Sequence, residues 1–285
     1  MNRNIETFLG CEAEYKEATT VIFGAPFDGT TSFRPGTRFA SKVMRSESYG
    51  LETYSPYQDV DLEDLSIYDG GDLDIPFGNP PKALDMIEEY TREVLNDNKT
   101  PLMIGGEHLV TLGAFRAIYE KYPEVHVIHF DAHTDLRDNY LGEKLSHASV
   151  IRRVWDLTGD NKIFQFGIRS GEREEFYWAK DHMYTNKFNL DTLEDIVEKI
   201  KDKPVYITID LDVLDPSIFP GTGTPEAGGV TFKELMNGIM TFSKLKNIVG
   251  IDINELSPQY DTSGTSTAVA CKVLREMLIV SNKNK

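Results

Sequence analysis

The chain is poor in cysteine and has no long apolar run. Its 285 residues include only Cys11 and Cys271, too few for a disulfide framework and unsuited to a thiolate metal site. No apolar stretch approaches the roughly 20 residues that a membrane span needs. Residues 1–6 lack the basic and apolar segments of a secretory signal. We therefore expect a cytoplasmic protein with no membrane partner.

Positive charge is also scarce. The chain has 46 acidic and 30 basic residues, which gives a formal net charge of -16 at pH 7. Such a surface repels nucleic-acid phosphates, so we expect no nucleic-acid partner. It can steer cations toward a cleft, although surplus carboxylates also keep proteins soluble without any such role. Charge alone therefore favours a cationic substrate only weakly.

The organisation of the chain predicts an α/β fold. No repeat, low-complexity stretch or linker divides it, so we expect a single domain over residues 1–285. Short apolar segments alternate with longer amphipathic ones, which predicts βαβ units and a mainly parallel central sheet covered by helices. The predicted strands are residues 20–24, 66–69, 101–104, 125–130, 162–167, 205–209 and 248–253. The predicted helices are residues 81–96, 109–122, 147–157, 193–201, 232–242 and 265–280.

Polar side chains stand at the ends of three predicted strands. His108, Asp131 and Asp210 each follow a nearly continuous apolar run. In open α/β sheets, ligands bind beyond the carboxyl ends of the parallel strands. We therefore expect these three segments to converge on one site.

The residues around these positions have the composition of a two-metal site. Alternating side chains point the same way in an extended chain, as in Asp131-Ala132-His133-Thr134-Asp135 and Asp210-Leu211-Asp212. Carboxylates in excess over imidazoles, without sulfur, suit manganese or a similar ion better than structural zinc. Four carboxylates at one point repel each other unless cations neutralise them. Each segment alone could be a turn or a cap, but together they predict two divalent ions on His108, Asp131, His133, Asp135, Asp210 and Asp212.

These segments resemble a known family. Gly105-Gly106-Glu107-His108, the 131–135 segment and Asp210-Leu211-Asp212-Val213-Leu214-Asp215-Pro216 are similar to the three signatures of the ureohydrolases. That family contains arginase, agmatinase, guanidinobutyrase and formimidoylglutamase. Residues 219–225 look like the family's extension of the third signature, and the resemblance covers about residues 21–278. It implies a three-layer α/β/α arginase-type fold, two Mn²⁺ ions per subunit, and homo-trimers that often pair as homo-hexamers.

The resemblance also implies how the ligands are shared. It places His108 and His133 on different ions, with Asp131 coordinating both or bridging them. Asp135 and Asp210 are implied to have a similar coordinating role, and Asp212 completes the shell around the His133 ion. Glu107 departs from the pattern, because many relatives have Asp there, and it is not carried over as a ligand.

The implied chemistry is attack of an activated water on a guanidinium carbon. Two ions about 3.5–4 Å apart lower the pKa of a bridging water from 15.7 toward roughly 7. Asp135 is implied to carry a proton to the departing amine, and His147 to shuttle protons with a near-neutral pKa. Glu255 matches the carboxylate that holds the guanidinium. His147 could instead be a cap or a surface histidine, and Glu255 an ordinary strand-end carboxylate.

Other candidate residues stay outside this set. His126 and His129 lie in the strand that precedes Asp131, and we expect them to pack or to support the ligands. Asp69-Gly70-Gly71-Asp72 looks like a metal motif, but the family uses its equivalent structurally. Arg169 could shape the pocket, and its role is open.

Substrate choice in the family depends on the residues that meet the tail opposite the guanidinium. Residues 136–146 lack the Ser- and Asn-containing arginase pattern and resemble the segment of bacterial agmatinases. Asp138 and Glu143 would suit a cationic amine tail. We therefore predict a small cationic guanidine substrate, agmatine, cleaved to putrescine and urea in polyamine biosynthesis.

Several alternatives stay open at this point. Guanidinobutyrase is the closest, because its substrate differs from agmatine only at the tail, and arginase or formimidoylglutamase activity is also possible within the family. A zinc-dependent deacetylase of the same fold uses one ion, whereas the six-residue set here favours two. A non-catalytic binding protein usually loses a ligand, and none is missing.

Overall fold

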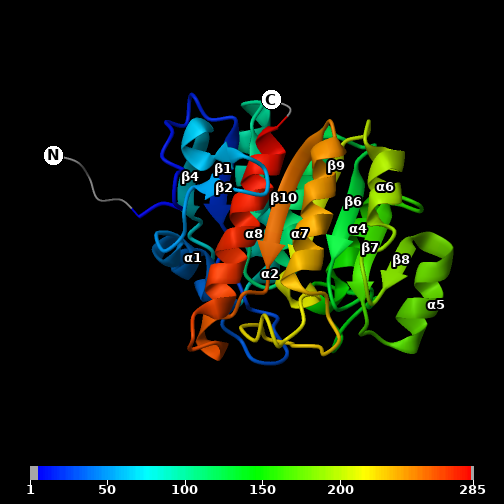
Figure 1. The fold of residues 1–285 in the computed structure, drawn as a ribbon. Coiled ribbons are helices and arrows are strands. Elements are labelled where there is room, and N and C mark those ends of the chain that lie inside the picture. The colour runs from blue at the N-terminus through cyan, green and yellow to red at the C-terminus, as the bar shows by residue number, and fades with distance from the viewer. Residues whose placement is uncertain (1–5, 284–285) are drawn as a thin grey trace.

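The computed structural model describes residues 6–283 and is built on one large parallel sheet (Figure 1). Its eight strands are hydrogen-bonded in a parallel sense at every neighbouring pair. The mainly parallel sheet expected from the sequence is therefore confirmed. Their order across the sheet is β4 (Ile67–Asp72), β1 (Thr20–Gly24), β5 (Thr100–Ile104), β10 (Ile248–Asn254), β9 (Val205–Asp210), β6 (His126–Phe130), β7 (Ile163–Ile168) and β8 (Tyr184–Lys187).

Helices cover both faces of this sheet and complete a three-layer α/β/α arrangement (Figure 1). One face is covered by α1 (Ala40–Ser48), α6 (Leu193–Ile200), α7 (Phe232–Thr241) and α8 (Thr265–Asn282). The other is covered by α2 (Pro80–Asn96), α3 (Val110–Lys121) and α4 (Val150–Thr158), with α5 (Arg173–His182) beside β8. Among residues 6–283, no helix combines the length and apolar character needed to cross a bilayer.

Shorter elements lie outside this framework. A small antiparallel pair is formed by β2 (Tyr54–Ser55) and β3 (Val60–Asp61). The 3-10 turns are η1 (Thr37–Phe39), η2 (Leu62–Asp64), η3 (His147–Ser149), η4 (Leu211–Val213), η5 (Phe242–Lys244) and η6 (Pro258–Tyr260).

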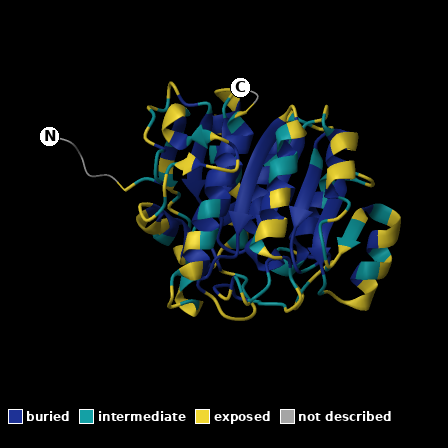
Figure 2. Cartoon of the chain, viewed as in Figure 1, coloured by how far each residue is buried: buried dark blue, intermediate teal, exposed yellow. Residues whose placement is uncertain are grey.

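The two hydrophobic cores follow from strand alternation. Successive side chains of a strand point to opposite faces, so Ile22 packs into one core while Phe23 packs into the other. Ile128 and Val127 divide in the same way. Figure 2 shows the result, with buried strands between helices that expose only their outer faces. Strands buried on both sides explain the nearly continuous apolar runs of the sequence.

Local signals set the helix boundaries. The Asn79 side chain accepts a hydrogen bond from the amide of Lys82, and prolines occupy the first turn of α2, a position where the missing N–H has no consequence. Thr231 and Glu234 form a reciprocal capping box at the start of α7.

The predicted strands and helices all have counterparts, and five elements were missed besides the 3-10 turns, namely β2, β3, β8, α1 and α5. β2 and β3 have two residues each, too few to show a strand periodicity. β8 is an edge strand of mainly polar residues, and α1 and α5 are largely polar helices. In these three elements the low overall hydrophobicity hides a helix or strand that tertiary packing stabilises. The predicted helix over 147–157 begins as η3 and continues as α4. The predicted domain 1–285 extends beyond the described residues at both ends.

Candidate metal centre and active-site pocket

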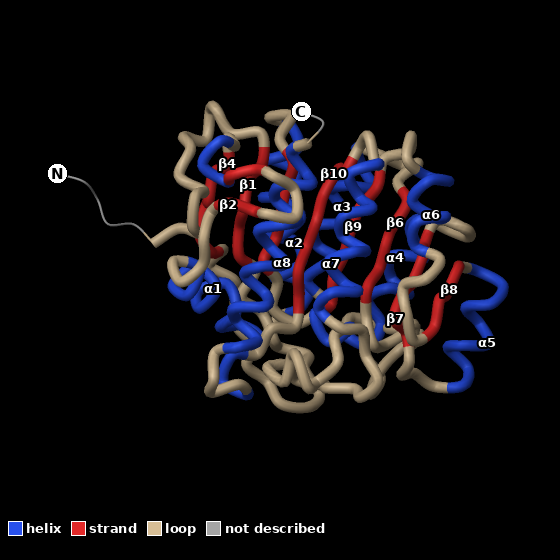
Figure 3. The backbone as a smooth tube through the Cα atoms, viewed as in Figure 1, coloured by secondary structure: helices blue, strands red, loops and turns tan. Residues whose placement is uncertain are grey.

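Four neighbouring strands bring the predicted residues to one edge of the sheet. β5, β10, β9 and β6 are adjacent, and their carboxyl ends open into the long loops that Figure 3 shows below the sheet. All the predicted ligands and Glu255 follow or end one of these strands. They are His108 after β5, Asp131, His133 and Asp135 after β6, Asp210 and Asp212 at the end of β9, and Glu255 after β10.

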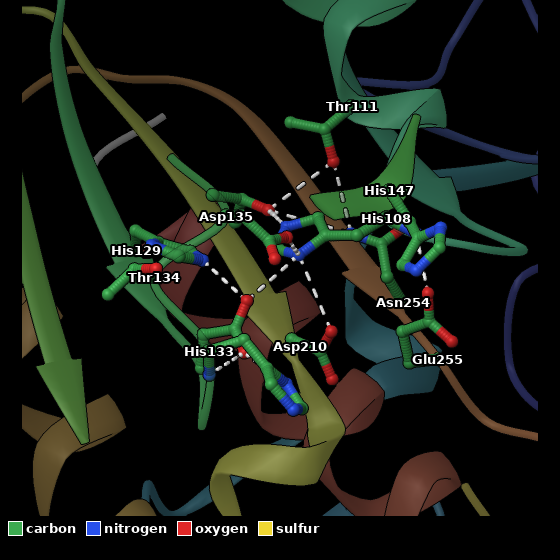
Figure 4. Close-up of polar contacts among 12 residues, drawn as sticks. His108, Thr111, His129, His133, Thr134, Asp135, His147, Asp210, Asn254 and Glu255 are labelled. Carbon is green, nitrogen blue, oxygen red and sulfur yellow. Dashed lines mark hydrogen bonds and ion pairs between the residues drawn. The ribbon is translucent and has the colours of Figure 1, made fainter. Parts of the chain in front are cut away.

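A first group of donor atoms surrounds the His108 imidazole (Figure 4). Its Nδ1 lies 3.1 Å from Oδ2 of Asp131, 3.2 Å from Oδ2 of Asp135 and 3.4 Å from Oδ2 of Asp210. Three carboxylate oxygens therefore lie within 3.4 Å of one ring nitrogen, which brings together the kinds of donor that a cation requires.

A second group surrounds His133. Its Nδ1 lies 2.9 Å from Oδ2 of Asp212 and 3.4 Å from Oδ1 of Asp131. The donor atoms of these three residues all lie within 4.8 Å of one another. Asp131 directs one oxygen toward each histidine, so the six predicted residues form two groups that share this carboxylate.

The charges of the two groups fit divalent cations. Burial, and then repulsion from Asp131, raises the pKa of Asp135 to about 7. Burial and the neighbouring Asp212 and Asp131 likewise raise the pKa of Asp210 well above its ordinary value. Burial alone would also raise the pKa of Asp131, but hydrogen bonds with histidines hold it well below the usual range. Buried carboxylates that repel each other are stabilised by bound cations.

A buried hydrogen-bond chain orients His108. Thr208 Oγ1 donates to Oδ1 of Asp252 at 2.6 Å, and its oxygen lies 2.8 Å from Nε2 of His108. Because the hydroxyl hydrogen is committed to Asp252, the Thr208 oxygen accepts from His108 Nε2–H. In the neutral ring the lone pair is then on Nδ1, the nitrogen that faces the three aspartates. A histidine ligand held in this way is typical of metal sites.

His129 is also close to Asp131, but both of its ring nitrogens are occupied. Gln165 Nε2 lies 3.1 Å from His129 Nδ1, and His129 Nε2 lies 2.8 Å from Oδ2 of Asp131. The amide can only donate, so Nδ1 accepts and Nε2–H donates to Asp131. His129 therefore orients the shared carboxylate, as the sequence analysis expected. His126, at the other end of β6, is bonded to the backbone carbonyl of Glu124.

Close backbone contacts explain the two glycines before His108. A Cβ at Gly105 would lie 1.7 Å from Oδ1 of Asn254, and one at Gly106 would lie 2.0 Å from the carbonyl oxygen of Phe27. The predicted catalytic carboxylates sit on unusual backbone as well. Asp135 has φ 53° and Glu255 has φ 67°, a left-handed conformation that is uncommon for residues other than glycine and that concentrates at functional sites.

A cavity of ≈ 270 Å³ opens above the two groups. Its floor includes His108, Asp135, Asp210 and Glu255. Glu255 uses Oε1 to accept the amide hydrogen of His108 at 2.8 Å. The carboxylate therefore keeps its other oxygen for a ligand in the cavity.

His147 lines the wall of the same cavity. Burial lowers its pKa to about 4, against a hydrogen bond with Thr30 that acts in the opposite direction. This pKa lies below the near-neutral value expected from the sequence. The imidazole is neutral at pH 7, so it is poised to accept a proton before it donates one.

The two acidic residues expected to bind the substrate tail, Asp138 and Glu143, lie outside the cavity lining. Asp138 is bonded to Arg153 at 3.1 Å and has an exposed side chain, and Glu143 lies on an exposed turn. Neither lines the cavity. The resemblance of segment 136–146 to the family's tail-binding segment suggested a pocket position, but Asp138 pairs with Arg153 and Glu143 lies on an exposed turn bridged to Tyr140.

Other charged side chains occupy the cavity mouth and were missed. Arg137 and Glu172 both line it, and Arg137 Nη1 pairs with Oε1 of Glu172 at 2.8 Å. Glu226 is not among the lining residues but contacts two of them, since its Oε1 accepts from the Ser170 hydroxyl at 2.9 Å and lies 3.9 Å from His133 Nε2. Glu226 lies within the stretch from residue 219 to Gly228-Gly229 that resembles the extension of the third signature, but the sequence does not show that it meets Arg137 and Glu172, because the loops that carry them come together only in the folded chain.

Arg169 and the 69–72 segment have structural roles. Arg169 donates to the carbonyl oxygens of Asp212 at 2.7 Å and of Glu226 at 2.9 Å, with further bonds to nearby carbonyls. It therefore ties the second ligand group to the loop at the cavity mouth. Asp69 instead accepts from the buried Arg45 and from the amide of Phe8, away from the metal groups.

Comparison with known proteins places this architecture among ureohydrolases. The profile of the arginase family matches residues 18–280. The chain is 48% identical over 277 residues to an agmatinase from Bacillus subtilis (strain 168), which covers 96% of each chain. It is 34% identical over 281 residues to a guanidinobutyrase from Pseudomonas aeruginosa, covering 94% of this chain and 88% of the relative. A crystal structure from Clostridium difficile, provisionally described as an agmatinase, superposes with a TM-score of 0.93 at 57% identity and covers 95% of this chain and 100% of that one.

Proposed function

This chain belongs to the arginase family, and from that premise we propose that it cleaves agmatine to putrescine and urea. The match to the B. subtilis agmatinase over nearly the whole length of both chains carries the proposal. The complete set of six donor residues beside Glu255 supports it, since hydrolysis needs both metal binding and a guanidinium site.

We propose Mn²⁺ as the cofactor, because oxygen donors outnumber nitrogen donors in both groups. His108, Asp135 and Asp210 would hold one ion and His133 and Asp212 the other. Asp131 would be shared, since its two oxygens face different groups. When bound, the ions supply Lewis acidity and activate water for attack.

Glu255 is suited to hold the guanidinium. A planar cation with forked N–H donors is complementary to a carboxylate. The His108 amide occupies Oε1 of Glu255, which fixes the direction of the side chain and leaves Oε2 for the substrate. This contact sets the guanidinium carbon over the ligand groups on the cavity floor.

Proton transfer falls to Asp135 and His147. Hydrolysis adds water to the guanidinium carbon, and the C–N bond to the chain breaks once the departing amine gains a proton. Asp135 stands on the cavity floor among the ligands, where it can take a proton from the attacking water and pass it to that nitrogen. His147 on the wall is neutral at pH 7 and can exchange protons with solvent.

The cavity mouth favours a cationic tail over the carboxylate of guanidinobutyrate. Arg137 is the one basic side chain among those lining the cavity, and Glu172 neutralises it. Glu226 adds a further negative charge beside His133. A substrate ammonium at this mouth meets a net negative surface, whereas a carboxylate would have to compete with Glu172 for Arg137.

Urea release from agmatine, guanidinobutyrate and arginine, and formamide release from formimidoylglutamate, which contains no guanidino group, test the proposal. Agmatine, guanidinobutyrate, arginine and formimidoylglutamate should be compared with Mn²⁺ added and after chelation, with His133→Asn as a metal-site control. We expect a clear preference for agmatine that requires metal and is lost in the variant. Preference for any other substrate would refute the agmatine assignment, and full activity after verified metal removal would refute the metal assignment.

Three further predictions remain proposals. We propose a single catalytic domain over residues 1–285, a cytoplasmic location, and assembly into homo-trimers or homo-hexamers. Light scattering on the purified full chain would test the assembly, and a mass equal to that of one chain would contradict it.

A further inference from the structure

A loop of residues 28–32 passes between Glu107 and His147 at the cavity wall. We propose that Glu107 acts through Thr30 of this loop as a positioning residue that fixes the orientation and tautomer of His147. The inference rests on the proposed function for the catalytic use of His147, but its geometric part does not. It also gives a role to the one signature residue that departs from the family pattern.

Glu107 is committed to this loop. Its side chain is fully buried, at 0% exposure. Oε2 accepts from the amide of Thr30 at 2.8 Å and from the hydroxyl of Thr31 at 3.0 Å, and Oε1 accepts from the hydroxyl of Thr30 at 2.5 Å. Three donors on one carboxylate anchor a loop that is 77 residues away in sequence.

Thr30 transmits this anchoring to His147. A hydroxyl has one hydrogen and two acceptor lone pairs. The hydrogen goes to Glu107, and one lone pair accepts the main-chain N–H of His147 at 3.1 Å. The same oxygen lies 3.5 Å from Nδ1 of the ring, at the outer limit of a hydrogen bond.

The direction of these bonds selects one tautomer. Because Glu107 takes its hydrogen, the Thr30 hydroxyl presents only a lone pair to His147 Nδ1, which favours a hydrogen on that nitrogen. Nε2 then carries the ring lone pair. It lies 3.2 Å from Oγ of Ser32, which also lines the cavity, so the basic nitrogen is placed at the cavity wall. Tyr140 contacts the ring edge to face, with centroids 5.9 Å apart, and limits its rotation.

The length of Glu107 matters for this arrangement. The main chain beside it is held by its own amide, which donates to the Phe27 carbonyl at 2.7 Å. Aspartate at this position would be shorter by one methylene, and the anchored backbone leaves little room to compensate. A carboxylate one bond shorter would lose its hold on Thr30.

The experiment compares Thr30→Val, Thr30→Ser and Thr31→Val in the full-length, metal-loaded protein. Valine at position 30 keeps the shape but removes both the donor to Glu107 and the acceptor for His147. Serine restores the hydroxyl. Thr31→Val removes one bond to Glu107 but touches no atom of His147, so it is the matched control. Glu107→Gln is a second, independent variant in case Thr30→Val does not fold.

Two readouts are needed. The first is the ring-nitrogen NMR spectrum of ¹⁵N-histidine-labelled protein loaded with diamagnetic Mg²⁺, with His147→Asn to assign the signal. We expect the Nδ1–H form in the wild type, Thr30→Ser and Thr31→Val, and a shift toward Nε2–H in Thr30→Val and Glu107→Gln. The second is steady-state kinetics with agmatine and Mn²⁺, together with metal content.

In kinetics we expect kcat to fall about 10-fold in Thr30→Val, a part of the roughly 10²–10⁴-fold that general acid–base catalysis supplies. KM and metal content should stay near wild type, and Thr30→Ser should recover most of the loss. Equal losses in Thr30→Val and Thr31→Val would overturn the positioning role, as would an unchanged His147 signal in Thr30→Val and Glu107→Gln. If the wild type does not hydrolyse agmatine, the proposed function fails, while the NMR comparison still decides the positioning.

Discussion

Replacing Thr208 with valine should weaken metal binding without disturbing the fold. Thr208 is fully buried in β9, in the middle of the sheet. Valine has nearly the same shape and favours strands. The change removes the acceptor of His108 Nε2–H at 2.8 Å and the donor to Asp252 at 2.6 Å. It therefore isolates the orientation of one proposed ligand from the packing around it.

The magnitude follows from the hydrogen bonds lost. An unpaired buried N–H costs about 1–3 kcal/mol, so the His108 ring gains by placing its hydrogen on Nδ1 instead, where three aspartates can accept it. That form has no lone pair for a cation at Nδ1. Loss of such a supporting contact typically lowers metal affinity by about 10- to 100-fold, which is about 1.4–2.8 kcal/mol of binding free energy at 25 °C.

Competition with a fluorescent chelator measures the affinity of both ions directly. Thr111→Val is the matched control, because Thr111 Oγ1 lies 3.4 Å from Thr208 Oγ1 and accepts from Asn254 but has no bond to His108. We expect one of the two dissociation constants to rise in Thr208→Val and neither to change much in Thr111→Val. The reasoning is refuted if Thr208→Val binds both ions as tightly as the wild type.

Three other perturbations have definite expected results. Glu255→Gln should lower kcat/KM for agmatine by at least about 100-fold, since a neutral amide holds a guanidinium poorly. Metal content measured by mass spectrometry should stay normal. Unchanged activity would contradict the role of Glu255 in holding the guanidinium. Glu172→Gln should raise KM for agmatine about 3- to 5-fold, the scale of one partly exposed ion pair. KM for guanidinobutyrate should not rise. Equal changes for both substrates would contradict the proposed tail contact. Asp261 accepts from the amides and hydroxyls of Ser263 and Ser266 at the start of α8, which lower its pKa from 3.8 to about 2 against the effect of burial. The contribution of Asp261 to stability is therefore complete above pH ~4 and is lost as pH falls toward 2. In urea denaturation, Asp261→Asn should lower the free energy of unfolding by about 1–2 kcal/mol at pH 7 and by less at pH 3. Equal losses at the two pH values would argue against this linkage.

Most of the architecture was predictable from local patterns. Strands buried on both faces are mostly apolar, so β6 and β9 were visible as short apolar runs. Helices of strong periodicity such as α2 were visible between the strands. The elements that were missed have little apolar signal of their own. β8 lies at the sheet edge, and α5 packs beside it, so neither needs a continuous apolar face.

The charged residues of the cavity mouth were beyond prediction. We expected Asp138 and Glu143 to bind the substrate tail because they are the acidic residues of segment 136–146, which resembles the tail-binding segment of bacterial agmatinases. In the structure Asp138 turns toward Arg153, and Glu172 reaches the mouth from the start of α5. Proximity along a loop does not decide the direction of a side chain, because the turn between two residues can point it either way.

The sequence by itself determined the kinds of donors and their positions at strand ends. Apolar runs followed by His108, Asp131 and Asp210 could be recognised locally, because a strand and the residues that follow it are consecutive in the sequence. These segments also identified the family and hence the class of reaction.

Only the tertiary structure decided how these donors are divided and oriented. The strand order β5-β10-β9-β6 brings segments far apart in sequence side by side, which makes Asp131 common to two groups and sets Glu255 against the amide of His108. The hydrogen bonds that select the tautomers of His108 and His147 likewise come from distant segments. Such contacts depend on which strands are neighbours, and no local periodicity encodes that order.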